Sequence, residues 1–272
     1  KDIKSVSKKS QKSDYIPIYD VKRGTIFNDS VEKVLQDYND VISDSLPEKP
    51  IKGPKMHIYI DEEKAKLYPP VRVLTARSRP VHLEQKCREN VQKLLDDGII
   101  IKTSDPSDEI YAGFHVLKTN GDVRLVVDMS PLCRKIKRPV HPFVPACDLI
   151  KKIPHNTTHL AVLDAVLGYH QLELDEESQK LTTFLLPEGK FRYKRACMGL
   201  SSTSDVFVER TSAILGHFQW MLQLIDDHLL FASSKQQLFQ RIRLFLQTCR
   251  EHNIGISKRK FQVSSESVTF AG

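Results

Sequence analysis

The segment Gln223-Leu224-Ile225-Asp226-Asp227-His228-Leu229-Leu230-Phe231 places two adjacent carboxylates between two short apolar runs. This pattern predicts two strands joined by a tight turn, since Asp side chains often accept hydrogen bonds from backbone N–H groups in turns. Two neighbouring carboxylates repel each other, however, and beside a strand suited to burial they need a basic side chain or a metal ion. From this segment alone, a solvated hairpin turn and a metal site are equally good interpretations.

A second apolar strand that ends in an acid lies upstream, at residues 159–164. If the two strands are neighbours in one antiparallel sheet, their acidic ends can converge. Carboxylates on strands of a basic protein are typical of a Mg²⁺ site that works on phosphates, because Mg²⁺ prefers oxygen ligands and completes its shell with substrate phosphates. Since adjacent strand residues point to opposite faces, we expect Asp164 and Asp226 to be the main metal ligands and Asp227 to support them.

Composition adds a preference for an anionic partner. The 272 residues include 41 Lys and Arg against 34 Asp and Glu, which gives a formal net charge of +7. No apolar run approaches the roughly 20 residues of a membrane span. Clustered cations indicate nucleic acid or, equally for any single cluster, a solubilising surface. The clusters are Lys1, Lys4, Lys8, Lys9 and Lys12; Arg134, Lys135, Lys137 and Arg138; and Lys258, Arg259 and Lys260.

Cysteine and histidine usage argues against a structural metal or disulfide framework. The five cysteines are odd in number and form no CxxC pair, which favours a reducing, intracellular compartment. His155 and His159 are four residues apart but have no further ligands near them, so they are weak zinc candidates. The lysine-rich N-terminus shows no signal-peptide pattern.

Hydrophobic periodicity and turn residues divide the rest of the chain into short elements, and residues 1–27 are interpreted as a tail or linker. We expect helices over residues 28–42, 80–97, 146–153, 204–216 and 238–253. We expect strands over 57–60, 71–76, 99–101, 114–118, 123–128, 159–164, 168–174, 182–186, 190–195, 220–225 and 229–232, and within 256–270. The mixture predicts an α+β fold.

One of these strand pairs has a distinctive turn. Residues 114–118 and 123–128 are joined by Thr119-Asn120-Gly121-Asp122, and Asn-Gly is the strongest short hairpin signal. Lys118 and Arg124 flank the tip. They either solubilise an exposed hairpin or bind a phosphate, for which Lys and Arg beside a mobile turn are well suited.

A series of motifs resembles, in order and spacing, those of gypsy-type retrotransposon reverse transcriptases. Leu163–Gln171 resembles L-D-x-x-x-G-Y-H-Q, and Leu224–Ser233 resembles [YF]-x-D-D-[IL]-L-[VI]-[FY]-S. Lys118–Asp128 is similar to the family's hairpin K-K-D-G-S-W-R-M-C-V-D-Y. Before it, Asp97–Ile100 matches the family's D/K-G-I-I element. The shorter matches are Thr182–Phe184 with K-T-A-F and Met198–Leu200 with F-G-L. Such motifs are weak singly and strong together, and these cover residues 80–272.

The resemblance implies a right-hand polymerase with fingers and palm, the palm being an antiparallel sheet backed by helices. It implies a tail, helix and linker over residues 1–55, fingers over 56–137 and 173–201, and palm over 138–172 and 202–272. Val268–Gly272 resembles the V-x-F-L-G strand that leads into the primer grip. We therefore expect the chain to end before the primer grip is complete and to lack a thumb and an RNase H domain.

The implied activity is RNA-directed DNA synthesis by two-metal phosphoryl transfer, with two Mg²⁺ ions or Mn²⁺ in their place. Asp164, Asp226 and Asp227 would be the catalytic, metal-binding residues. The implied partners are an RNA or DNA template with its primer, dNTPs, and the rest of a Pol polyprotein (protease, thumb, RNase H and integrase). The implied location is a cytoplasmic virus-like particle or the nucleus, without membrane association.

Motif position also implies roles for other residues. Lys118 and Arg124 would contact the triphosphate of the incoming nucleotide, Tyr169 would lie under its sugar, and Met198 would line its pocket. For Tyr169 and Met198 the alternative is core packing. The primer and template contacts would be Ile225 and Gly199.

Several supporting positions depart from the family motifs. Leu224 replaces the Tyr of Y-x-D-D. At other motif positions, Cys197 and Ser204 replace prolines of the family, Ser130 replaces an Arg, and Cys133 replaces an Asn. The pattern fits a divergent active enzyme. It also fits a catalytically impaired or domesticated copy that binds nucleic acid through its basic clusters.

Overall fold

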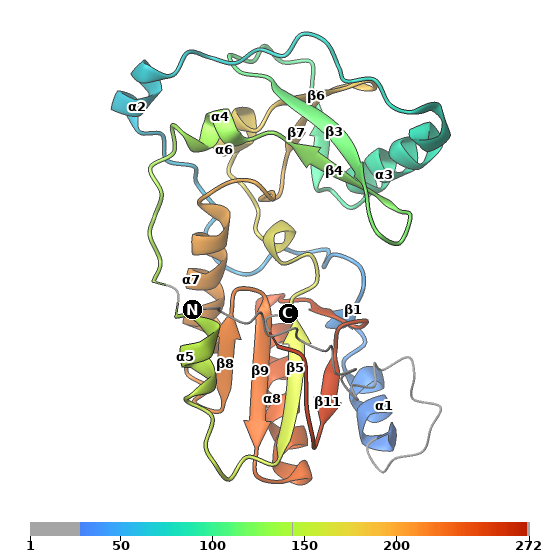
Figure 1. The fold of residues 1–272 in the computed structure, drawn as a ribbon, viewed down its shortest axis with the longest axis vertical. Helices are drawn as coiled ribbons and strands as arrows, with labels where there is room; N and C mark the ends of the chain where they lie inside the picture. Colours follow the sequence, from blue (N-terminus) through green and yellow to red (C-terminus); the bar gives the residue numbers. More distant parts are fainter. Residues whose placement is uncertain (1–27, 143, 271–272) are drawn as a thin grey trace, which may run out of the picture.

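The structure is a computed structural model that describes residues 28–142 and 144–270 (Figure 1). The first lysine cluster and the last two residues, Ala271 and Gly272, lie outside the described residues. Two principal sheets follow each other along the long axis of the molecule, a four-stranded sheet below and a five-stranded sheet above in Figure 1. Within the described ranges, no helix has the length and apolar character needed to cross a membrane.

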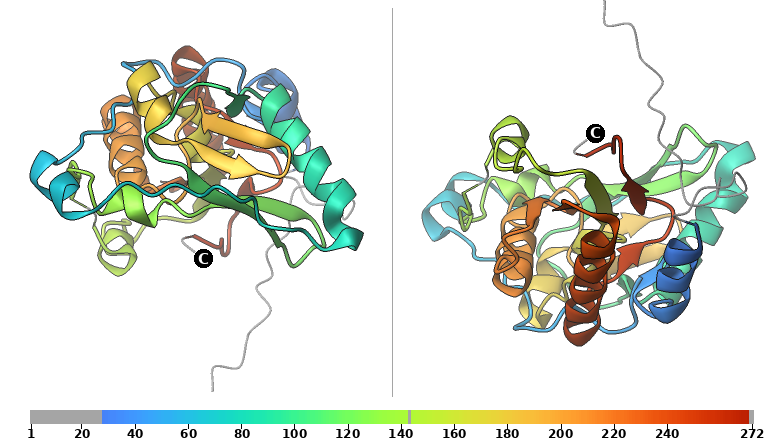
Figure 2. Two further views of the ribbon diagram at one scale, coloured as in Figure 1. Left: turned by 90° about the horizontal axis from the view of Figure 1, so that it is seen from above. Right: turned by 90° about the horizontal axis from the view of Figure 1, so that it is seen from below.

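The four-stranded sheet is antiparallel and carries the acidic strand ends. Its strand order is β11 (Gln262–Ser264), β5 (His159–Asp164), β9 (Asp227–Ala232) and β8 (Met221–Leu224). One face packs on α7 (Thr203–Leu215) and α8 (Lys235–His252), which lie side by side in Figure 2. The other face forms a smaller apolar cluster with α5 (Ala146–Ile150). Both central strands are therefore apolar on both faces, which explains their nearly continuous apolar sequence.

The five-stranded sheet contains the predicted hairpin. Its order is β2 (Ile100–Lys102), β7 (Gly189–Tyr193), β6 (Phe184–Leu186), β3 (Tyr111–Leu117) and β4 (Val123–Val127). Helix α3 (Glu84–Asp96) packs beside β4. Gly113 allows β3 to approach β6, because a Cβ atom there would lie 2.8 Å from Leu186 Cδ2. The hairpin tip points from this sheet toward the four-stranded sheet (Figure 1).

The N-terminal elements are fastened to the end of α8 and to the segment that follows it. Helix α1 (Asn28–Asp37) leads to β1 (Ile42–Ser43), which pairs in parallel with β10 (Ile256–Ser257). Arg250 forms a 2.6 Å ion pair with Asp40, and Arg243 forms a 2.7 Å pair with Asp37. These contacts explain the apolar face predicted for residues 31–42, most of which is buried.

The predicted elements around the acidic strands and the fingers hairpin are confirmed, but three predictions are wrong. Residues 57–60 and 71–76 form only isolated bridges, at Ile60 and Arg72. Residues 168–174 are not a strand, because they begin as a 3₁₀ turn (Gly168–Gln171). Helices α2 (Glu62–Leu67), α4 (Ser130–Cys133) and α6 (Glu176–Leu181) were missed. Helices α2 and α6 each begin after an Asp that accepts from the backbone N–H three residues on, a cap signal visible in the sequence.

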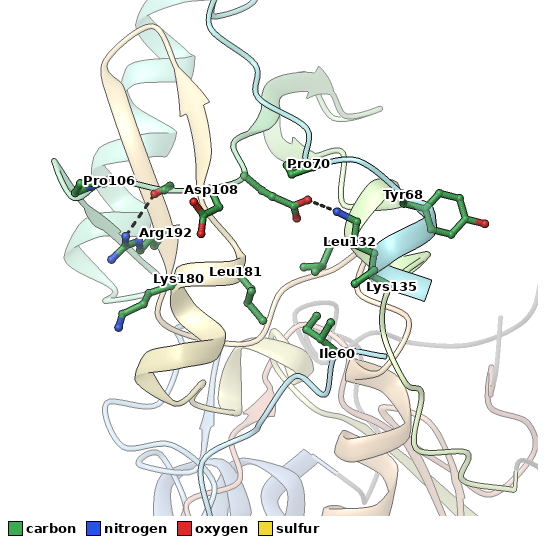
Figure 3. A pocket seen from close by; sticks show the side chains of 13 residues that line it. Ile60, Tyr68, Pro70, Pro106, Asp108, Leu132, Lys135, Lys180, Leu181 and Arg192 are labelled. Carbon is green, nitrogen blue, oxygen red and sulfur yellow. Dashed lines mark hydrogen bonds and ion pairs between the residues drawn. The ribbon is translucent and has the colours of Figure 1, made fainter. Parts of the chain in front are cut away.

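A pocket of about 360 Å³ lies between α2, α4 (Ser130–Cys133) and α6 (Figure 3). Lys135 lines it, almost fully buried, and forms an ion pair with Glu109. On the opposite side Arg192 is equally buried and forms a 2.8 Å ion pair with Asp105. Lys135 was expected to belong to a surface cluster of cations. The structure instead places its charge in a buried ion pair.

Replacing Lys135 with Met removes the cation and leaves the Glu109 carboxylate without it. We expect the free energy of unfolding to fall by about 3 kcal/mol, because breaking a buried pair on one side typically costs about 3–5 kcal/mol. Urea unfolding followed by circular dichroism measures this loss. The control is Lys66→Met, which breaks an exposed pair with Glu63 and should cost less than about 1 kcal/mol. Equal losses would contradict a role for burial.

Candidate active site

The turn between β8 and β9 consists of two residues, Ile225 and Asp226, and β9 begins at Asp227. Ile225 has a φ of 55°, a left-handed conformation that costs a β-branched residue on the order of 1–3 kcal/mol. Its carbonyl accepts a 3.0 Å hydrogen bond from Gln223 Nε2. The Asp226 carbonyl accepts a 2.9 Å bond from the N–H of Ala165. The predicted strand–turn–strand is confirmed, and its turn is bound to the end of β5.

Strand pairing brings the acidic residues together. Asp164 lies directly opposite Asp227 in the antiparallel register of β5 and β9. Opposite residues point to the same face, here the face that carries α5 and not α8. The sequence argument that separated Asp226 from Asp227 by strand alternation does not apply, because Asp226 lies in the turn. The division into main and supporting metal ligands stays a prediction.

The pKa values of Asp164 and Asp226 are raised, chiefly by burial. Burial raises the pKa of Asp164 to about 7; its ion pair with Lys260 opposes this shift, while the charge of Asp226 and a hydrogen bond with Asp227 add to it. Burial also raises the pKa of Asp226, and the charge of Asp227 adds to that shift. The site therefore concentrates negative charge that its own cation only partly neutralises.

That cation, Lys260, was missed as a site residue. Its Nζ lies 2.6 Å from Asp164 Oδ2. Burial alone would lower the pKa of Lys260, but the bond to Asp164 and the charges of Asp226 and Asp227 raise it. The sequence feature that pointed to Lys260 was the basic cluster at residues 258–260. The cluster alone does not place Lys260 beside Asp164. The antiparallel β11–β5 register does, because it pairs Gln262 with Val162 and, extended by two residues, sets Lys260 opposite Asp164.

The donor set suits a divalent cation. Three carboxylates converge at this sheet end, and oxygen ligands are those that Mg²⁺ prefers. Among the residues that the structure describes, no three His, Cys, Asp or Glu side chains already surround one metal position. Mg²⁺ does not require such a cage, since one or two carboxylates and substrate phosphates complete its shell. The raised carboxyl pKa values fit a site that a cation would neutralise.

A cavity of about 340 Å³ gathers most of the predicted nucleotide-binding residues, although none of the three acids lines it. Lys118 and Arg124 line it from the β3–β4 hairpin, and Met198 and Gly199 line it from the loop before α7. Met198 is 53% exposed, which excludes core packing as its main role. Leu167, three residues after Asp164, is also part of the wall.

Tyr169 and Ile225 do not line this cavity. The Tyr169 ring packs edge-on against Phe207 with 5.9 Å between centroids. Burial raises the Tyr169 pKa, and the negative charge of Asp226 adds to the shift. Tyr169 is thus half-buried in the core and next to Asp226. Its position under the nucleotide sugar stays a prediction. Ile225 is half-buried at the turn.

A buried glutamine holds the loop after Asp164 in place. Gln171 donates from Nε2 to the carbonyls of Val166, at 2.7 Å, and Gly255, at 2.9 Å. Its Oε1 accepts from the Gly255 N–H at 2.9 Å. Gly255 permits this contact, because a Cβ atom there would lie 2.4 Å from Pro47 Cγ. The Gln of the G-Y-H-Q motif is therefore a structural link between the β5 loop and β10.

His228 is a fully buried departure from the apolar residue expected beside the acid pair. Its Nδ1 lies 3.3 Å from the Leu163 carbonyl oxygen, and no partner for Nε2 is found among the described residues. Burial lowers its pKa to about 4. The imidazole is consequently neutral at physiological pH, and nothing in the structure explains why it replaces an aliphatic side chain.

Comparison with known proteins was consistent across sequence and structure. Residues 116–272 match the family described as reverse transcriptase (RNA-dependent DNA polymerase). The enzymatic polyprotein of figwort mosaic virus (strain DxS) is 25% identical over 97% of this chain and 41% of its own length. The retrovirus-related Pol polyprotein from transposon 412 of Drosophila melanogaster is 24% identical over 91% of this chain and 20% of its own.

Solved structures share the fold. The foamy viral protease-reverse transcriptase in complex with an RNA/DNA hybrid has a TM-score of 0.80 at 15% identity, over 94% of this chain and 33% of that chain. This likeness confirms the fingers-and-palm fold with its antiparallel sheets. The chain spans less than half the length of these polyproteins and of that structure.

Replacing His228 with Leu should remove an acid-dependent loss of stability. The pKa of this His is near 6.5 in the unfolded chain and about 4 in the folded protein. Above pH 6.5 it therefore does not affect the free energy of unfolding. As the pH falls toward 4 it lowers that free energy, because only the unfolded chain then binds the extra proton. We expect the wild type to lose about 3 kcal/mol relative to His228→Leu between these pH values. Urea unfolding at pH 7.5 and 4.5 measures the difference, and parallel pH dependences in the two proteins would contradict it.

Proposed function

Since the chain belongs to the reverse transcriptase (RNA-dependent DNA polymerase) family, we propose that it adds deoxynucleotides to a primer 3′-hydroxyl on an RNA or DNA template. Two observations carry this proposal: the pairing of Asp164 with Asp227, and a cavity that Lys118 and Arg124 line together with Leu167, three residues after Asp164. Carboxylates that can hold divalent ions and cations that can hold a triphosphate are the two parts that nucleotidyl transfer needs.

Asp164 and Asp226, supported by Asp227, are the proposed ligands of two Mg²⁺ ions, or of Mn²⁺ in their place. When bound, such ions activate the 3′-hydroxyl and neutralise the leaving pyrophosphate. Lys118 and Arg124 bind the triphosphate, for which the guanidinium fork of Arg is well suited. These charged groups act chiefly by positioning the triphosphate and neutralising its charge.

The remaining residues are assigned to the nucleotide and to the primer–template. Met198 lines the nucleotide pocket, and Tyr169 lies under the sugar, where its ring excludes a 2′-hydroxyl. Ile225 contacts the primer end and Gly199 the template. The exposure of Met198 in the cavity and the position of Tyr169 beside Asp226 support these roles.

The proposed partners are a template–primer and dNTPs. A related structure is described in complex with an RNA/DNA hybrid, which supports the same partner here. We assign fingers to residues 56–137 and 173–201 and palm to 138–172 and 202–272, and the two principal sheets fall within these limits. Because the relatives are polyproteins, we also propose that the chain works as part of one, in virus-like particles of the cytoplasm or in the nucleus.

A non-catalytic nucleic-acid-binding function is the second candidate. The ion pair between Lys260 and Asp164 favours it, since the pair partly neutralises the acid that metal binding requires. The Lys260 side chain is 62% exposed, however, and an exposed cation exchanges readily. The carboxylate cluster itself argues for catalysis, because carboxylates that face a phosphate backbone would lower the nucleic-acid affinity of a protein that only binds.

Asp226→Asn should lower primer extension on an RNA template at least about 100-fold, because a lost metal ligand removes several kcal/mol of charge stabilisation from the transition state. Asp164→Asn should do the same, and Asp227→Asn should cost less if Asp227 is a supporting ligand. Primer extension with Mg²⁺ measures all three. Template–primer binding by each variant is the control, and it should not weaken. Normal binding by a wild-type chain that shows no extension would favour the second candidate.

A further inference from the structure

Three consecutive cations, Lys258, Arg259 and Lys260, follow β10, and they face different surroundings. Lys260 contacts Asp164. Arg259 lines the same cavity as Lys118 and Arg124. It does so from the segment between β10 and β11, whereas the other two cations come from the hairpin that points down toward it (Figure 1). The cavity therefore has cations from both sheet layers.

We propose that Arg259 is a third phosphate-binding side chain of this cavity, which binds the triphosphate of the incoming nucleotide from the palm side, and that Asp44 positions it. This inference rests on the proposed function, because it names a further contact to the nucleotide of that reaction. Met198 shares the cavity wall with Lys118 and Arg124, so an anion bound there lies beside three of the residues assigned to the nucleotide.

The backbone of Arg259 is fixed by the N-terminal strand. In the parallel β1–β10 pair, Ile42 lies opposite Ile256, and the Lys258 N–H donates to the Ser43 carbonyl at 3.2 Å. Asp44 follows directly. Its Oδ1 accepts from the Arg259 N–H at 3.1 Å and from the Ser257 hydroxyl at 3.2 Å. Residues 42–44 thus hold the segment that carries both Arg259 and Lys260.

The guanidinium of Arg259 has an ion-pair partner but keeps hydrogen-bond donors available. Its Nε lies 3.3 Å from the same Asp44 Oδ1, and the side chain is 73% exposed. Within the described residues no hydrogen bond from its Nη groups is found, so the fork that matches phosphate oxygens is available. An exposed ion pair contributes little. A triphosphate can therefore replace Asp44 as the partner of Arg259 at small cost.

Asp44 itself also lines the cavity, where its charge opposes an incoming anion. It has two separable roles, since its oxygen accepts backbone and hydroxyl hydrogen bonds while its charge holds the guanidinium. Asn at this position keeps an acceptor oxygen and loses the charge. The substitution Asp44→Asn therefore separates the structural role from the electrostatic one.

The experiment measures steady-state incorporation of dTTP on poly(rA)·oligo(dT) with Mg²⁺. We expect Arg259→Ala to raise KM for dTTP about tenfold, the equivalent of one charge-assisted hydrogen bond, with kcat changed less than about twofold. Lys258→Ala is the matched control, because it removes the same charge from the neighbouring exposed position, which does not line the cavity. It should leave KM for dTTP unchanged.

The Asp44→Asn variant tests the positioning role. Released from Asp44, Arg259 should bind the triphosphate more readily, and KM for dTTP should fall about two- to threefold. In a chain that also carries Arg259→Ala, the same substitution should lose most of this effect, which a double-mutant cycle measures. Equal effects of Asp44→Asn in both backgrounds would overturn the coupling between the two residues.

Two results would overturn the assignment of Arg259. One is an equal change in KM for dTTP in Arg259→Ala and Lys258→Ala. The other is weaker template–primer binding by Arg259→Ala with an unchanged KM, which would make Arg259 a contact of the nucleic-acid backbone. If the wild type shows no incorporation, the proposed function fails, and equilibrium binding of dTTP with Mg²⁺ takes its place as the readout. Arg259→Ala must then weaken dTTP binding relative to Lys258→Ala, and thermal unfolding confirms that both variants fold.

Discussion

The pairing of β5 with β9 is the constraint on which the site depends. Its register sets Asp164 across from Asp227 on one face of the sheet. Two charges of the same sign that face each other across a strand pair destabilise it. The apolar side chains of both strands, buried against α8 on one face and α5 on the other, hold the pair together. Burial therefore has two consequences. It fixes the carboxylates in position, and it raises the pKa of Asp164 and Asp226.

The site is completed by segments that are distant in sequence. The fingers hairpin supplies Lys118 and Arg124, and the segment after α8 supplies Arg259 and Lys260. Buried hydrogen bonds fix the segment after α8 against the loop that follows Asp164, above all the three between Gln171 and the backbone of Val166 and Gly255. Such a network allows one arrangement only, because a buried polar group left unpaired is costly.

Local patterns were sufficient to predict the acidic strands and the hairpin. Both have signals that act within a few residues, namely continuous apolar runs and the Asn-Gly turn, and the structure confirms them. The 3₁₀ turn at Gly168–Gln171 could not be found this way, because Gln171 is held by Gly255, far along the chain. Lys260 and Asp44 were missed for the same reason. Their roles follow from the β11–β5 and β1–β10 pairings, which no local pattern encodes.

Both missed residues belong to ion pairs of one kind. In each pair the cation is more exposed than its carboxylate, with side-chain exposures of 62% against 6% for Lys260–Asp164 and 73% against 32% for Arg259–Asp44. A cation that keeps most of its hydration leaves its partner at little cost, whereas the buried Asp164 carboxyl must be either protonated or compensated by a positive charge. Each acid is thus paired with an exposed side chain that can exchange partners. Under the proposed function, divalent ions would take over the charge of Asp164, and the triphosphate would engage Arg259. Exchangeable ion pairs of this kind reconcile a folded, crowded carboxylate site with the proposed binding of metal and nucleotide.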